Sequence, residues 1–118
     1  MPKGTYEKGL MGEAKAIEAL QQRGMVLLAK RYHSPFGEID AVMQDGETLV
    51  FVEVKARHQS GAGTGLLSVD MRKRRKIIKT ALAYMTEHSC TCAARFDVVE
   101  WTADGFAHIM DAFQGSEF

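Results

Sequence analysis

Two acidic segments of the chain lie on either side of a turn signal. The first, Gly37-Glu38-Ile39-Asp40, carries two carboxylates, and the second carries Glu53 with Lys55 two residues later. Carboxylate oxygens are the ligands that hard divalent cations prefer, and a lysine ammonium can neutralise charge on a phosphate. Residues of these types at this spacing therefore indicate a metal-dependent phosphodiesterase site.

The turn signal between the two segments is Asp45-Gly46, a pair that tolerates the positive φ angles of a type I′ turn. We expect residues 38–44 and 47–55 to form an antiparallel hairpin, with Gln44 opposite Glu47. Because side chains alternate along a strand, this register places four charged residues on one face: Glu38, Asp40, Glu53 and Lys55. The other face then carries Ile39, Ala41, Met43, Val50, Val52 and Val54. Three carboxylates beside one lysine are costly to desolvate unless a cation balances them.

The same charged face has a simpler interpretation. A Glu-x-Lys pattern arises often by chance, and an acidic strand face is commonly the solvated side of an antiparallel sheet. Here, however, the face also carries Val42, Leu49 and Phe51, so it is not a purely polar exterior. This mixture favours a functional site and leaves the solvated face as the alternative.

Composition limits the class of protein. The 118 residues, 46% of them apolar, fit one globular domain over residues 1–118. A formal net charge of zero argues against a uniformly basic nucleic-acid binder, although it allows local basic clusters. The longest apolar stretch, residues 25–29, is too short to span a bilayer, and the first residues resemble no secretory signal. We therefore expect a cytoplasmic protein without membrane contact.

Cysteine usage agrees with a reducing compartment. Cys90 and Cys92 are separated by one residue, which is too close for a comfortable structural disulfide. Together with His88 they offer three ligands for a soft metal, but at an unusual spacing. We interpret them as loop thiols.

The first predicted helix covers residues 6–23, with Gly24 at the position of a C-terminal cap. Its apolar stripe consists of Tyr6, Leu10, Ala14, Ile17 and Leu20. Glu13 falls inside that stripe at about 100° per residue. A carboxylate facing the core needs a partner, which could be a backbone group, an arginine or a metal site.

The remaining pattern predicts an α/β fold. Strands are expected at residues 25–32, in the hairpin, and at 95–101 and 106–110, the last two joined through Ala103-Asp104-Gly105. A glycine-rich segment, residues 57–67, leads to a second helix from about residue 69 or 70 to 88. The buried stripe of this helix is expected to contain Ile77, Ile78, Ala81, Leu82 and Met85. These elements predict a central mixed sheet of about five strands flanked by helices.

The second helix begins with a run of cations: Arg72, Lys73, Arg74, Arg75 and Lys76. The helix dipole disfavours cations at this end by roughly 0.3–1 kcal/mol each when they are exposed. Such a run suggests an anion site, and a nucleic-acid backbone is the natural polyanion for it. A solvated basic face is the alternative. Arg74 points toward the apolar stripe, so the candidate nucleic-acid-binding residues are Arg57, Arg72, Lys73 and Lys76.

The order of elements, with Asp40 on one hairpin strand and Glu53 and Lys55 on its mate, resembles the restriction-endonuclease-like core of the PD-(D/E)xK nuclease superfamily. The chain resembles more closely the YraN-like family, which is related to archaeal Holliday-junction resolvases. The resemblance covers nearly the whole length and is carried by Gly9 with Glu13, Gly37 to Asp40, Phe51 to Arg57, Lys73, Arg95 to Val99, and Ala112-Phe113. Ile39 precedes Asp40, which matches the YraN-like pattern but departs from the proline in the superfamily's name.

The resemblance implies a set of roles. Asp40 and Glu53 would bind the metal together with the carbonyl of Val54, Lys55 would be the catalytic lysine, and Glu13 would be the helix acid that extends the catalytic and metal site. Oxygen ligands suit Mg²⁺ or Mn²⁺. The implied activity is a metal-dependent endonuclease acting on DNA, with branched DNA as a candidate substrate and a homodimer as a candidate assembly.

Two other functions remain open at this stage. A noncatalytic nucleic-acid-binding protein could keep the nuclease fold and the basic helix while its acidic residues only shape the hairpin. A protein-interaction module with exposed sheet edges would have no salt-sensitive affinity for nucleic acid. Metal-dependent cleavage separates the endonuclease from both.

Overall fold

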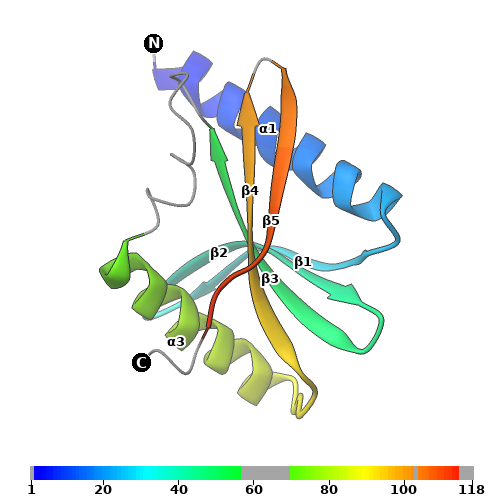
Figure 1. The fold of residues 1–118 in the computed structure, drawn as a ribbon. Helices are drawn as coiled ribbons and strands as arrows, with labels where there is room; N and C mark the ends of the chain where they lie inside the picture. The colour runs from blue at the N-terminus through cyan, green and yellow to red at the C-terminus, as the bar shows by residue number, and fades with distance from the viewer. Residues whose placement is uncertain (1, 57–69, 103, 115–118) are drawn as a thin grey trace.

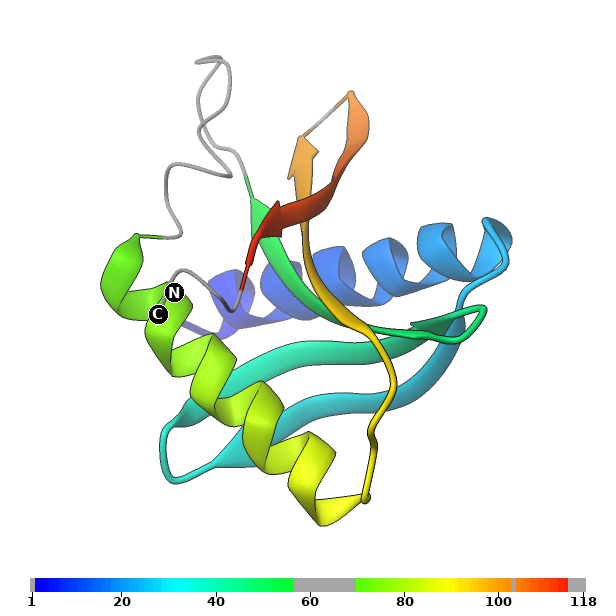
Figure 2. The same ribbon diagram turned by 60° about the horizontal axis from the view of Figure 1, so that its bottom comes forward.

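Two helices lie on opposite sides of a five-stranded sheet in the computed structural model of the chain (Figures 1 and 2). The structure describes residues 2–56, 70–102 and 104–114, without the side chains of residues 2–11, 56 and 102. The elements in chain order are α1 (Pro2–Gln22), β1 (Val26–Ser34), β2 (Gly37–Asp45), β3 (Thr48–Ala56), α3 (Met71–Glu87), β4 (Ala94–Thr102) and β5 (Gly105–Phe113). No helix in these described ranges is long and apolar enough to cross a membrane.

The strands are hydrogen-bonded in the order β1-β2-β3-β4-β5. All neighbouring pairs are antiparallel except β3 and β4, which are parallel. A parallel pair needs a long crossover connection, and α3 provides it between these two strands. The predicted α/β fold with a mixed sheet of about five strands is therefore confirmed.

The β2–β3 turn lies one residue later than predicted. Asp45 pairs with Thr48, so the two-residue loop is Gly46-Glu47 rather than Asp45-Gly46. Gly46 has a φ of 61°, and Glu47 is not among the residues with positive φ, as in a type II′ turn. The predicted register was therefore wrong by two residues. Because side chains repeat with a period of two, this even shift leaves Asp40 and Glu53 on a common face.

Each face of the sheet is covered by one helix. On one face, Val42, Leu49 and Phe51 pack with residues of α3, including Ile77 and Tyr84. The opposite face contributes a second apolar cluster with α1: Ala16, Ile17, Leu20, Ala41, Met43, Val50 and Val52. The face that carries the acidic residues is thus covered by α3, and the alternative of a solvated acidic face is wrong.

Ile39 departs from the predicted alternation, because it packs in the cluster of α3 rather than beside Ala41. The reason lies in β1, where Arg31 has a φ of 49°. Ala29 and Tyr32 flank Arg31, and both pack on the α3 side although they are three residues apart. The alternation of side chains between the two faces therefore shifts by one residue at this point in β1, next to the strand that carries Ile39.

Two positions in the predicted helix stripes are also wrong. Ala14 is exposed, and Ala16 is buried in its place. Leu82 is 58% exposed, whereas Tyr84 is buried. Leu82 lies about 100° around the helix from buried Ala81, beyond the width of the contact that α3 makes with the sheet.

Candidate metal and nucleic-acid site

The site lies where β2 and β3 part. Their pairing extends to Ala41 and Val52, the residues next to Asp40 and Glu53, whereas β3 continues to pair with β4 as far as Ala56. Beyond the last pair, the Asp40 carboxylate accepts a hydrogen bond from the backbone N–H of Val54 at 2.8 Å. This bond fixes the orientation of Asp40 at the fork between the two strands.

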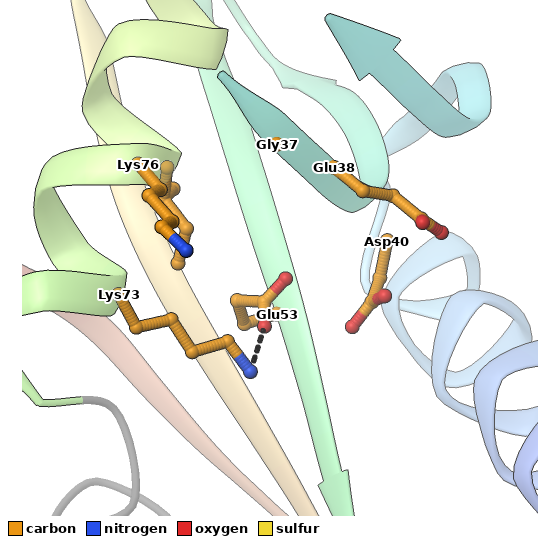
Figure 3. A pocket seen from close by; sticks show the side chains of 7 residues that line it. Gly37, Glu38, Asp40, Glu53, Lys73 and Lys76 are labelled. Atoms are coloured by element: carbon orange, nitrogen blue, oxygen red, sulfur yellow. Dashed lines mark ion pairs between the residues drawn. The ribbon is translucent and has the colours of Figure 1, made fainter. Parts of the chain in front are cut away.

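A pocket of about 310 Å³ occupies the fork. It is lined by Gly37, Glu38, Asp40, Glu53, Lys73, Lys76 and Ile77, so β2, β3 and the first turns of α3 form its walls. Figure 3 shows the carboxylates of Asp40 and Glu53 directed toward each other, with the Lys73 side chain reaching Glu53 from α3. The pocket therefore brings two carboxylates and two helix lysines together.

The carboxylates of Asp40 and Glu53 lie close together where they are partly removed from water. Glu53 is 5% exposed, and its Oε2 lies 3.1 Å from the Nζ of Lys73 and 3.9 Å from the Nζ of Lys55. Burial and the charge of Asp40 nevertheless raise the pKa of Glu53 to about 7. Burial also raises the pKa of Asp40, against the opposing effects of the Val54 hydrogen bond and the lysines. Both carboxylates would therefore be stabilised in their charged form by a further cation.

The pKa values of the two lysines beside Glu53 shift in opposite directions. Burial, and then the contact with Lys73, lower the pKa of Lys55. Burial alone would also lower the pKa of Lys73, but its hydrogen bond with Lys55 and the charge of Glu53 raise it overall. Lys55 is thus the lysine that releases a proton more readily, and Lys73 is the one that keeps its charge.

Sequence reasoning assigned Lys73 to nucleic-acid binding alone and missed its ion pair with Glu53. A signal for it was present, because Lys73 precedes buried Ile77 by four residues and so lies on the same face of α3. That face covers the strand that carries Glu53. Lys73 should therefore have been considered together with the acidic residues.

Glu13 does not line the pocket. Its Oε1 accepts a hydrogen bond from the Nε of Arg31 at 3.0 Å, and its side chain is 16% exposed. Of the three partners considered from the sequence, the structure pairs Glu13 with an arginine. Arg31 lies between Lys30 and Tyr32, which pair with Ala41 and Ile39, so its backbone lies opposite that of Asp40 on the neighbouring strand.

The donor set of the pocket fits a hard cation that retains water. Within the described ranges, no three His, Cys, Asp or Glu side chains are grouped closely enough to hold a metal by themselves. Asp40 and Glu53 would supply two carboxylates, and the carbonyl of Val54 would supply a third oxygen. Mg²⁺ commonly binds through one or two carboxylates and keeps several waters, so this set suits it.

The basic residues that were predicted to bind nucleic acid, and Arg74 beside them, differ in their surroundings. Arg72 and Lys76 are exposed, and Lys76 also lines the pocket. Arg74 lies over the Phe113 ring at 5.3 Å, in agreement with its predicted direction toward the apolar stripe. Arg57 and the glycine-rich segment 57–67 lie outside the described residues.

The N-terminus of α3 is capped by the chain itself. The Asp70 side chain accepts a hydrogen bond from the backbone N–H of Lys73 at 2.9 Å. This carboxylate uses one of the amides that an external anion would need. Attraction of an anion to this end of α3 therefore depends mainly on the cationic side chains. Cys90 and Cys92 are free thiols beyond the other end of the helix.

Residues 12–100 match the sequence model of a family described as uncharacterised protein family UPF0102. A UPF0102 protein of Chlorobium chlorochromatii is 42% identical over 122 residues, covering 95% of this chain and 95% of that protein. A UPF0102 protein of Persephonella marina is 39% identical over 110 residues, covering 92% and 95%. One from Xanthomonas campestris is 40% identical over 117 residues, covering 90% and 96%. The matched range contains the whole pocket.

Proposed function

This chain belongs to the UPF0102 family, the YraN-like group of PD-(D/E)xK-type proteins, and we propose that it is a metal-dependent endonuclease that hydrolyses phosphodiester bonds in DNA. One observation carries the proposal. The buried carboxylate of Glu53 and the half-buried one of Asp40 face each other at a strand fork, and desolvation raises the pKa of both despite two adjacent lysines. A protein gains little stability from such an arrangement, whereas a cation-dependent enzyme needs it.

In this mechanism Asp40, Glu53 and the carbonyl of Val54 would hold Mg²⁺ or Mn²⁺, which would supply Lewis-acid activation of water and of the phosphoryl oxygens. Lys55, whose Nζ lies 3.9 Å from Glu53, would orient the attacking water. Lys73 remains cationic and stabilises the charge that develops on the phosphate.

Glu13 and Arg31 support this site from the side of α1. The backbone of Arg31 lies opposite that of Asp40 on the neighbouring strand, so the ion pair between Glu13 and Arg31 holds this β1 segment in place. Metal binding by Glu13 stays a prediction; because Glu13 pairs with Arg31 and does not line the pocket, we propose that it contributes by positioning β1. The proposed contribution is therefore to the orientation of Asp40.

Exposed cations beside the pocket support DNA as the substrate. Lys76 lines the pocket, and Arg72 lies one turn earlier on the same helix. A phosphate in the pocket would leave the adjoining phosphates within reach of these two side chains. We propose that Arg57, Arg72, Lys73 and Lys76 bind the backbone, and that two copies of the chain assemble when both strands are cut.

The test combines cleavage with metal binding. Labelled duplex, single-stranded and four-way-junction DNA are incubated with Mg²⁺, Mn²⁺, Ca²⁺ or EDTA, and manganese affinity is measured by calorimetry. We expect cleavage with Mg²⁺ or Mn²⁺ only, and loss of both cleavage and manganese binding in Glu53→Gln. Glu18→Gln, an exposed change on α1, is the matched control. Absence of metal binding at millimolar concentration and of cleavage of every substrate would refute the enzyme.

A second candidate function is a noncatalytic nucleic-acid-binding protein. It is favoured by the 3.1 Å ion pair between Lys73 and Glu53, which gives the acid a partner without a metal. In that case wild type would bind DNA with a steep salt dependence, and Glu53→Gln would leave the affinity unchanged. The same set of measurements therefore separates the two functions.

A further inference from the structure

Phe36 is an aromatic residue whose ring is left in solvent beside the pocket. It is 50% exposed in the turn between β1 and β2, and it directly precedes Gly37, which lines the pocket. An exposed aromatic ring gives up much of the favourable burial that such a side chain can contribute. Core packing therefore does not account for a phenylalanine at this position.

The backbone of this turn is held firmly although the ring is exposed. The N–H of Phe36 donates a hydrogen bond to the Oγ of Ser34 at 3.1 Å. That Oγ lies 3.0 Å from the Oγ1 of Thr80, a fully buried residue of α3. The turn is thus anchored to α3 through two side chains, and the ring is presented in a defined place.

A cation of α3 lies over the Phe36 ring. The Nζ of Lys79 lies 5.7 Å from the centroid of the Phe36 ring. Lys76, which lines the pocket, precedes Lys79 by three residues and is therefore its neighbour on the surface of α3. The half-exposed ring therefore lies next to a cation of α3, and its residue directly precedes Gly37 in the pocket lining.

We propose that Phe36 is a stacking platform for an unpaired nucleobase adjacent to the phosphate in the pocket. A base inside a duplex has both faces covered by its neighbours, whereas an unpaired base can stack on an aromatic side chain. Lys76 and Lys79 would pair with the phosphates on either side of that base. The substrate class is therefore DNA with unpaired bases at the cleavage point, such as a single strand or the arm of a branch. This inference rests on the proposed function for the phosphate in the pocket.

The test measures binding without cleavage. Fluorescence anisotropy in Ca²⁺ compares a labelled 20-nucleotide single strand with the blunt duplex of the same sequence. A stacked base contributes about 1–3 kcal/mol, which corresponds to a factor of about 5 to 150 in affinity. Phe36→Ala and Phe36→Leu should weaken single-strand binding by at least about fivefold, and duplex binding by less than about twofold. Phe36→Tyr keeps an aromatic ring and should bind as wild type does.

A matched control and a direct probe complete the experiment. Leu82→Ala removes a different exposed apolar side chain, on α3 and 58% exposed, and should leave both affinities unchanged. A 2-aminopurine placed successively along the single strand should change its fluorescence at one position with wild type, and this change should be absent with Phe36→Leu. Circular dichroism checks that each variant is folded.

Three results would overturn the inference: equal single-strand affinity of wild type and Phe36→Leu, equal losses on single strand and duplex, or no single-strand binding by wild type at low salt. DNA binding measured in Ca²⁺ does not require turnover, so the outcome is independent of cleavage. Loss of single-strand preference in Phe36→Leu, in a protein that never cleaves, would support the platform and refute the endonuclease. Cleavage by wild type, together with an unchanged single-strand affinity of Phe36→Leu, would support the endonuclease and refute the stacking platform.

Discussion

In two regions of the sheet, the pKa values of acidic residues shift in opposite directions. In the pocket, burial raises the pKa of Asp40 and Glu53. In β4, Asp97 is 1% exposed, yet its pKa is lowered, because hydrogen bonds from His108, Arg95 and the backbone of Asp111 outweigh the effect of burial. Glu53 and Asp97 are both almost fully covered, so the number and charge of the hydrogen-bond donors account for the difference between these two acids.

The environment of Asp97 satisfies its charge. Arg95 donates to both carboxylate oxygens, and the Nε2 of His108 lies 2.7 Å from Oδ2. The Nδ1 of His108 is 3.0 Å from the guanidinium of Arg23, which can only donate, so the ring proton lies on Nε2 and points to Asp97. Asp97 joins β4, β5 and Arg23, which follows α1, in one network. A hydrogen-bonded buried acid of this kind stabilises a fold, whereas desolvation of the pocket acids disfavours their charged form.

The strongest test of this comparison is the catalytic effect of neutralising one acid from each group. Glu53→Gln should lower the cleavage rate by at least about a thousandfold, because the amide keeps the shape but loses the charge that holds the metal. Asp97→Asn should retain the wild-type rate per folded molecule. The rates are measured on one DNA substrate at saturating Mn²⁺. A similar loss of cleavage rate in both variants would mean that the two acids do not differ in function.

The effects on stability should be reversed. Asp97→Asn leaves Arg95 with a weakened buried partner, so it should lower the free energy of unfolding by about 3–5 kcal/mol. Glu53→Gln removes a charge that desolvation disfavours and should leave that free energy unchanged or increase it. Urea denaturation at pH 8 without metal measures both. A Glu53→Gln variant as unstable as Asp97→Asn would make Glu53 a structural acid.

Replacement of Lys55 should separate turnover from metal binding. Lys55→Ala should slow cleavage by about a hundredfold, because the lysine acts on water and on the phosphate rather than on the ion. Its manganese affinity should stay within about threefold of the wild-type value, a change of less than about 0.7 kcal/mol. Calorimetry and single-turnover kinetics measure the two quantities. A large loss of manganese affinity would assign Lys55 to maintaining the charge balance of the pocket.

The pH dependence of stability should also differ between the groups. The pKa of Glu53 rises from 4.5 to about 7 on folding, so its contribution favours the folded state at low pH and is lost as the pH rises through about 7. Asp97 has a lowered pKa, so its contribution is present above its ordinary pKa of 3.8 and is lost as the pH falls below it. Relative to wild type, Glu53→Gln should therefore gain stability between pH 5 and pH 8, by up to about 3 kcal/mol. Urea denaturation at several pH values measures this difference, and a gain that is flat over the range would contradict it.

The smallest expected effect concerns the cations around each group. Arg72→Ala with Lys76→Ala removes two cations beside the pocket and should flatten the dependence of log affinity on log salt by about 1.8. Lys15→Ala with Arg23→Ala removes one cation of α1 and one that directly follows it and contacts the Asp97 network, and should leave the slope unchanged. Duplex binding between 50 and 200 mM salt measures both slopes. Equal slopes in the two variants would mean that neither region is the nucleic-acid-binding surface.

The amino-acid sequence determined which side chains of the hairpin share a face, with Ile39 as the exception. Alternation depends only on the period of a strand, so Asp40 and Glu53 remained together when the turn moved by one residue. Helix spacing likewise predicted the direction of Arg74, which lies over Phe113. The order of apolar runs, turn residues and the crossover helix was enough to predict a mixed five-stranded sheet. All of these are properties of neighbouring residues.

The tertiary structure decided which distant residues meet and how strongly each charge is buried. Lys73 is twenty residues from Glu53 in the chain, and only the packing of α3 on the sheet brings its ammonium to within 3.1 Å of that carboxylate. Glu13 could have met a metal or an arginine, and the shift in side-chain alternation at Arg31 places the arginine beside it. The pKa of an acid depends on desolvation and on every neighbouring charge, which come from different elements. For this reason the opposite behaviour of Glu53 and Asp97 emerges only in the folded chain.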